Sequence, residues 1–162
     1  MPDEDAIPDE ARRTRFLPYD PGPLPVAPPP SPGDSITLDA DGLPPEKIPG
    51  RSLRNPTNPR YHRVQQLRRK AITAMAGRAW YRGPVLLDVE VWVRELEANR
   101  TLLDYVGGVM DTLDGGHGPH FTYLPIVYED DAQVSSGKWR LYEDATHDRY
   151  QVKATFMAKG AA

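Results

Sequence analysis

The spacing of apolar residues between Pro59 and Gly77 predicts an amphipathic helix. Apolar side chains recur there every three or four positions, which is the helical period. Thr57-Asn58 directly before a proline is a typical helix start, because asparagine caps free N–H groups and proline fits the first turn. The side chains expected to face the core are Val64, Leu67, Ala71 and Met75, with Ile72 at the margin of the stripe.

Strict alternation from Val85 to Val93 predicts a strand. Its apolar residues would face the core and the intervening ones, including Asp88 and Glu90, the other side. Further strands are expected over Ser35–Leu38, as a short edge strand, and over Val134–Tyr142 and Tyr150–Met157.

A second helix is expected near residues 102–113, where apolar residues again form one stripe: Leu102, Val106, Val109, Met110 and Leu113. Asp104 and Asp111 lie two turns apart on the opposite face, with Gly107 and Gly108 between them. Glycine weakens a helix by about 1 kcal/mol relative to alanine. The glycine pair therefore indicates close approach by another backbone, from a partner helix or a phosphate chain.

The resulting order of elements predicts an α+β fold, in which two main helices pack on a mixed β-sheet. Ten of the eighteen prolines fall within residues 1–34, which we interpret as a disordered Pro-rich tail. Residues 35–158 would then form a single domain.

Composition removes several classes of function. The chain has no cysteine, so disulfides and thiolate metal sites are excluded. No Walker-type loop or dinucleotide-binding fingerprint is present. No apolar run approaches the roughly 20 residues that span a membrane, and the acidic N-terminus lacks the apolar core of a secretory signal. A cytoplasmic protein without membrane association is expected.

Charge is unevenly distributed along the 162 residues. The formal net charge is −3, yet no Asp or Glu occurs between Lys47 and Leu87, where ten basic residues lie. Such a segment is typical of nucleic-acid binders, although a basic surface that balances acids elsewhere is the alternative. The side chains expected to contact DNA are Arg51, Arg54, Arg60, Arg63, Arg68, Arg69 and Lys70.

Acidic residues gather after this segment. The second helix carries Asp104 and Asp111, and Glu129-Asp130-Asp131 follows a glycine-rich loop. Carboxylates are the preferred ligands of Mg²⁺, which keeps several waters and can share its shell with a phosphodiester. A solvated acidic surface is the alternative. Basic residues combined with an acidic cluster favour a metal-dependent nuclease.

The motif VMDTL, followed after a loop by YEDDAQV and a lysine-containing strand, resembles the RusA-type Holliday junction resolvases. The resemblance spans about Ser35 to Phe156 and is close between Leu103 and Val134. It implies a small homodimeric endonuclease that nicks four-way DNA junctions with Mg²⁺ or Mn²⁺. It also implies metal ligation by Asp130 and Asp131, with Asp111 either a further ligand or a residue that orients the ligands.

The chain departs from the family pattern within the second helix. Thr101 and Leu103 stand where the family has aspartates, Asp104 where it has asparagine, and Gly107 where it has lysine. Either Asp104 takes over ligation together with Glu97 or Glu95, or the protein binds junctions without cutting them.

In the first case Asp104, rather than Thr101 or Leu103, carries the metal-binding role of the helix, and Asp114, beyond the helix, is expected to tolerate loss of its charge. Lys138 would stabilise transition-state charge in place of the missing lysine, or is an ordinary surface lysine. The catalytic set is thus Asp104, Asp111, Asp131 and Lys138. Gln133 either bonds to a phosphate or orients a ligand, or it caps the adjacent strand. His117 and His120 have a zinc-like spacing without further ligands nearby.

Overall fold

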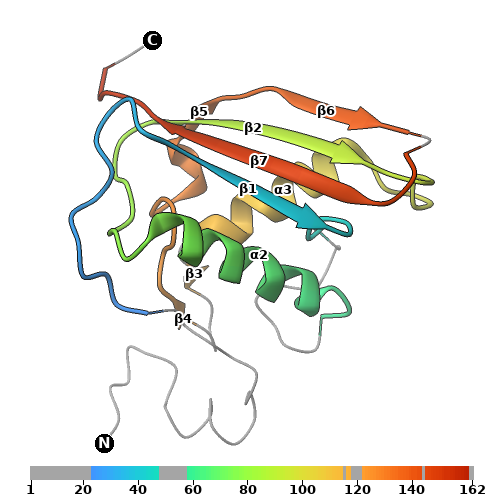
Figure 1. The fold of residues 1–162 in the computed structure, drawn as a ribbon, viewed down its shortest axis with the longest axis horizontal. Helices are drawn as coiled ribbons and strands as arrows, with labels where there is room; N and C mark the ends of the chain where they lie inside the picture. The colour runs from blue at the N-terminus through green and yellow to red at the C-terminus, as the bar shows by residue number, and fades with distance from the viewer. Residues whose placement is uncertain (1–22, 48–57, 115, 118–121, 144, 161–162) are drawn as a thin grey trace, which may run out of the picture.

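The described residues form a mixed five-stranded sheet with two helices on one of its faces (Figure 1). The computed structural model describes residues 23–47, 58–114, 116–117, 122–143 and 145–160. Arg51, Arg54, His120 and the first 22 residues of the expected tail lie outside the described residues. The expected α+β class is confirmed.

The sheet has the order β1-β7-β2, and β5 and β6 lie one after the other along the outer edge of β2. Both β1 and β2 pair antiparallel with β7, whereas β5 and β6 run parallel to β2. The strands are β1 (Ser35–Asp41), β2 (Val85–Trp92), β5 (Val134–Ser136), β6 (Trp139–Tyr142) and β7 (Arg149–Phe156). Two further short strands, β3 (Gly116–His117) and β4 (Thr122–Tyr123), pair with each other.

Helices α2 (Tyr61–Met75) and α3 (Leu102–Leu113) cover the same face of the sheet (Figure 1). The expected core positions of α2 are confirmed, since Val64, Leu67, Ala71 and Met75 are all buried. The helix begins two residues later than expected. Asn58 Oδ1 accepts a hydrogen bond from Arg60 N at 2.8 Å, so Asn58 caps a turn that precedes the helix.

Alternation in β2 is also as expected. Leu87, Val89 and Val91 are fully buried against the helices, while the residues between them face the other side. On that outer face, the rings of Trp92 and Tyr142 stack with centroids 5.1 Å apart, and the Arg149 guanidinium lies 3.9 Å from the Trp92 ring. Among the described residues, the buried side chains of the sheet and the helices therefore form one core between them.

The expected strand over Val134–Tyr142 is interrupted at Gly137. A Cβ on Gly137 would lie 1.9 Å from the Leu87 carbonyl oxygen, so β2 approaches more closely there than any side chain allows. Lys138 N donates to Asp88 Oδ1 at 3.0 Å rather than continuing the ladder. The edge is therefore divided into β5 and β6.

The last residues of the expected tail, which was predicted to reach residue 34, are bonded to the domain. Val26 N and Ala27 N both donate to Gly77 O, at 2.9 and 3.0 Å, and Ala79 N donates to Ala27 O. Gly33 N donates to Phe156 O at 2.7 Å. These main-chain bonds attach residues 26–34 to the domain, because proline-rich sequence still offers carbonyls and the non-proline N–H groups for pairing.

Candidate metal centre

Three carboxylates converge at the C-terminal end of α3. Asp111 lies in the last turn of the helix, Asp114 directly follows it, and Asp131 opens the short 3-10 helix η1 (Asp131–Gln133). One carboxylate oxygen from each lies within 4.8 Å of the others. Asp114 is buried, and the other two are partly exposed. We call these three residues the acidic group, and two of its members, Asp111 and Asp131, reach solvent.

Main-chain hydrogen bonds bring these residues together across the intervening loop. Leu113 O, at the end of α3, accepts from Ile126 N at 3.3 Å and from Val127 N at 3.1 Å. The buried Tyr128 hydroxyl donates to Met110 O at 2.9 Å. The returning chain is thus fixed along the last turn of α3, and Asp131 follows three residues after Tyr128.

Gln133 holds the acidic turn in place. Its Oε1 accepts from Glu129 N at 2.8 Å and Asp130 N at 3.0 Å. Its Nε2 donates to Tyr81 O at 2.8 Å and Gly83 O at 2.9 Å. The side-chain amide therefore ties the turn to the segment that leads into β2, so its role is to position Asp131.

The acidic group is electrostatically strained. Burial raises the pKa of Asp131, and hydrogen bonding to Asp130 and the charge of Asp111 raise it further. Burial, followed by the charges of Asp114, Asp131 and Asp111, raises the pKa of the Tyr128 hydroxyl well above its ordinary value. Crowded negative charge of this kind favours binding of a cation.

One cation already contacts the group. Lys47 Nζ lies 3.3 Å from Asp111 Oδ2, and the lysine side chain is about half exposed. Sequence reasoning missed Lys47 because it lies in the proline-rich connection after β1, far from the motifs. Asp114 was likewise assigned no role, since its participation depends on how the loop after α3 returns.

The structure places Asp104 at the other end of α3. Its Oδ2 accepts from Thr101 N at 2.9 Å, forming a capping box at the start of the helix. Asp104 is not a member of the acidic group, although it was the expected ligand. Asp114, expected to be dispensable, is a member instead.

Asp130 and Lys138 are also placed outside the group. Asp130 Oδ1 accepts from Ala132 N at 2.9 Å and caps η1, and this hydrogen bond lowers the pKa of Asp130. The carboxylate adjoins Asp131 and is exposed. Lys138 is exposed at the junction of β5 and β6, where its main chain bonds Asp88.

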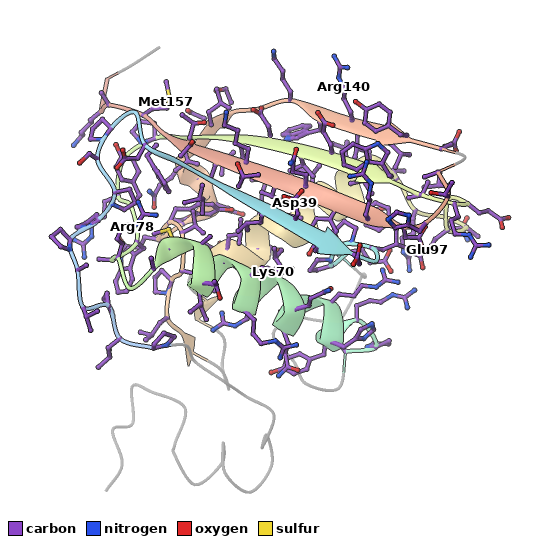
Figure 2. All side chains as sticks on the ribbon, viewed as in Figure 1. Asp39, Lys70, Arg78, Glu97, Arg140 and Met157 are labelled. Carbon is purple, nitrogen blue, oxygen red and sulfur yellow. The ribbon has the colours of Figure 1, made fainter. Side chains whose placement is uncertain are left out.

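The basic residues of α2 divide into two kinds. Arg68 is buried, and Arg60 and Arg63 form ion pairs within the protein. Arg69 and Lys70 are exposed, and they line a groove between α2 and β1 that also includes Asp39 (Figure 2). Of the basic side chains expected to contact DNA, these two are the accessible ones on α2.

Glu46 and Glu97 form ion pairs with Arg60 and Arg63. Arg60 Nε lies 2.7 Å from Glu46 Oε1, and an Arg60 terminal nitrogen 2.8 Å from Glu97 Oε2. Arg100 Nε lies 2.6 Å from the other oxygen of the fully buried Glu46, as an ion pair whose angle is not that of a hydrogen bond. The basic segment between Lys47 and Leu87 therefore presents fewer unpaired positive charges in the folded protein than its sequence suggests.

Glu97 is occupied by this network. Tyr105 donates its hydroxyl hydrogen to Glu97 Oε1 at 2.6 Å, and Arg63 lies 3.3 Å from the same oxygen. Burial alone would raise the pKa of Glu97, but the Tyr105 and Arg63 hydrogen bonds and the charges of Arg63 and Arg60 outweigh it and lower the pKa. The carboxylate is committed to structural partners rather than to the acidic group.

Comparison with known proteins adds no identification. No family model matches the chain, and no curated protein is significantly similar to it. In the part of the chain that the structure describes, no helix combines the length and apolarity needed to cross a membrane.

Proposed function

We propose that this protein is a metal-dependent endodeoxyribonuclease that nicks four-way and other branched DNA. The observation that carries the proposal is the convergence of Asp111, Asp114 and Asp131 within 4.8 Å. The order of the motifs, which resembles that of RusA-type resolvases, supports DNA junctions as the substrate class.

The acidic group fits a hard divalent cation by the chemistry of its donors. It offers carboxylate oxygens alone, from three residues, which suits Mg²⁺ or Mn²⁺ better than zinc. Asp111, Asp114 and Asp131 would hold the ion. When bound, the ion supplies polarisation of the phosphate and a water of lowered pKa.

The protein's own residues position the ion and the substrate. Gln133 fixes the turn that bears Asp131, and the burial of Asp114 limits the competition of water for its carboxylate. Hydrolysis would break one P–O bond of the backbone, with water supplying the hydroxyl to phosphorus and a proton to the departing oxygen. Arg69 and Lys70 would hold the DNA backbone through contacts that do not depend on sequence.

A homodimer would place two such sites on opposite strands of a junction. Among the described residues, Leu103 on α3 and Trp139 on β6 are large apolar side chains that remain exposed, at 64% and 41%. The two elements contact each other beside the free edge of the sheet. We propose this edge as the dimer contact; sedimentation of the Trp139→Glu variant as a monomer would support it.

Incubation of the purified protein with a labelled four-way junction tests the activity. We expect nicks with Mg²⁺ or Mn²⁺, their loss in Asp114→Asn, and their retention in Asp41→Asn, which changes a well-exposed carboxylate on β1. A protein that shifts the junction in a gel but leaves it intact with either metal would instead be a junction-binding protein without catalytic activity.

A further inference from the structure

The connection after β1 lies directly against α3. A Cβ on Gly108 would come within 2.0 Å of the Pro45 carbonyl oxygen, so only glycine permits this approach. Lys47 N donates to Asp104 O at 3.3 Å. The close backbone approach expected at the glycine pair is thus made by the protein's own chain.

The Lys47 side chain then runs along α3 towards the acidic group. Its Cδ and Cε would lie 3.1 Å from a Cβ on Gly107, so the lysine side chain crosses the helix at Gly107. Asp104, Gly107 and Asp111 follow one another along one face of the helix. Lys47 Nζ ends 3.3 Å from Asp111 Oδ2.

Glu46, the residue before Lys47, holds this part of the chain in place. Glu46 is fully buried and pairs with Arg60 and Arg100, which belong to the start of α2 and the segment before α3. Arg63 also lies 3.7 Å from Glu46, and a buried carboxylate held by three arginines cannot shift without leaving charge unpaired. The backbone at Lys47 is therefore fixed, while its ammonium remains accessible to solvent and to a ligand.

The charge balance indicates what the ammonium does. The Lys47 ammonium offsets part of the negative charge of the three carboxylates, and a divalent cation bound among them would offset more of it. A site whose negative charge is reduced in this way repels a phosphodiester less. An exposed ion pair contributes little to stability, so the contact with Asp111 alone does not explain this placement.

We propose that Lys47 is the phosphate-binding cation of the metal centre. Without metal its ammonium pairs with Asp111, and in the loaded site it donates hydrogen bonds to the DNA phosphate bound there. The inference rests on the proposed function for its substrate, but it makes separate claims about metal binding and about DNA binding.

The test compares Lys47→Met and Lys47→Arg with Lys153→Met, which removes an exposed lysine from the opposite face of the sheet. Calorimetric titration with Mn²⁺ alone comes first. Removal of the ammonium beside Asp111 should tighten Mn²⁺ binding roughly 3- to 10-fold in Lys47→Met, since a competing positive charge is lost. Lys153→Met should bind Mn²⁺ as the wild type does.

The second readout uses a four-way DNA junction. Lys47→Met should lose the gain in junction affinity that Mn²⁺ confers, and its single-turnover cleavage should fall about 100-fold, as when one donor to a developing oxyanion is removed. Lys47→Arg should recover much of both. Unchanged Mn²⁺ affinity, or an unchanged metal-dependent gain in junction affinity, in Lys47→Met would overturn the inference.

The outcomes separate this inference from the proposed function. If the wild type does not cut, the nuclease proposal fails, but the Mn²⁺ affinities and the metal-dependent junction affinity still decide the role of Lys47. If the wild type cuts and Lys47→Met cuts equally well, the nuclease proposal stands and the role of Lys47 is refuted.

Discussion

Replacement of Asp114 by asparagine should change stability in opposite directions with and without metal. The substitution keeps the size of the side chain and its capacity to accept hydrogen bonds, and it removes one negative charge from the acidic group. In the absence of metal this relieves repulsion, because Asp114 is buried beside two other carboxylates. With metal bound, the same charge is a ligand, and its loss weakens binding.

The separation of the oxygens sets the size of the effect. Two unit charges at the upper limit of 4.8 Å repel by roughly 3.5 kcal/mol at an effective dielectric constant of about 20, and closer charges repel more. Solvent at the exposed carboxylates and the nearby Lys47 ammonium reduce this. We therefore expect Asp114→Asn to raise the free energy of unfolding in a chelator by about 1 kcal/mol, or about 2–4 °C in Tm for a domain of this size.

With Mg²⁺ present, the wild type should be more stable than Asp114→Asn. A ligand at 100 times its Kd stabilises the folded state by about 2.7 kcal/mol, so saturating Mg²⁺ should raise the wild-type Tm by roughly 5–10 °C. Asp114→Asn should gain little. Thermal unfolding followed by circular dichroism, in EDTA and in MgCl₂, measures both effects on the same samples.

The matched control is Asp104→Asn. Asp104 caps the start of α3, where a negative charge contributes about 0.3–1 kcal/mol through the helix dipole. This variant should lose that amount in both buffers and keep its full response to Mg²⁺. If Asp104→Asn loses the Mg²⁺ response and Asp114→Asn keeps it, the assignment of the metal centre to the C-terminal end of α3 is refuted.

Three further predictions follow from individual contacts. Gly108→Ala should lower the free energy of unfolding by about 2 kcal/mol or more in urea titrations, because its Cβ would meet the Pro45 carbonyl oxygen. The lowered pKa of Glu97 contributes stability that is present above the ordinary carboxyl pKa and lost as the pH falls through the lowered value, so Glu97→Gln should flatten the acid limb of a pH–stability curve. Joint replacement of Arg69 and Lys70 by alanine should weaken junction binding equally for all sequences and reduce the slope of log affinity against log salt by up to about 2, which binding titrations at several salt concentrations would measure.

The main elements of the fold follow from local patterns. The apolar period of α2 and the alternation in β2 are properties of short segments, and the buried side chains are those that the patterns select. The predictions were wrong in detail where contacts between residues far apart in the sequence determine the structure. The division of the edge strand at Gly137 depends on the approach of the Leu87 carbonyl, which no local pattern encodes.

A cluster of acids in this part of the chain was predictable from the sequence, but not which residues belong to it. Asp111 and Asp131 could be recognised as acids near one another, while Asp114 enters the group only because Ile126 and Val127 return to bond Leu113. Charge counting along the chain also missed ion pairs between distant residues. Arg60 finds its partners 14 and 37 positions away, at Glu46 and Glu97, so part of a segment without acids is paired in three dimensions.

The placement of charge along α3 gives an independent reason to expect a cation. The C-terminal end of a helix carries a partial negative charge and favours basic residues. Here the last turn has no basic residue, and Asp111 and Asp114 add negative charge at that end, with Asp131 beside them. Local rules of stability are broken in this way mainly where a function requires it. A bound divalent ion would turn the same arrangement into a favourable one, because the helix end and the carboxylates would then all face a positive charge. The stability crossover predicted for Asp114→Asn measures this reversal directly.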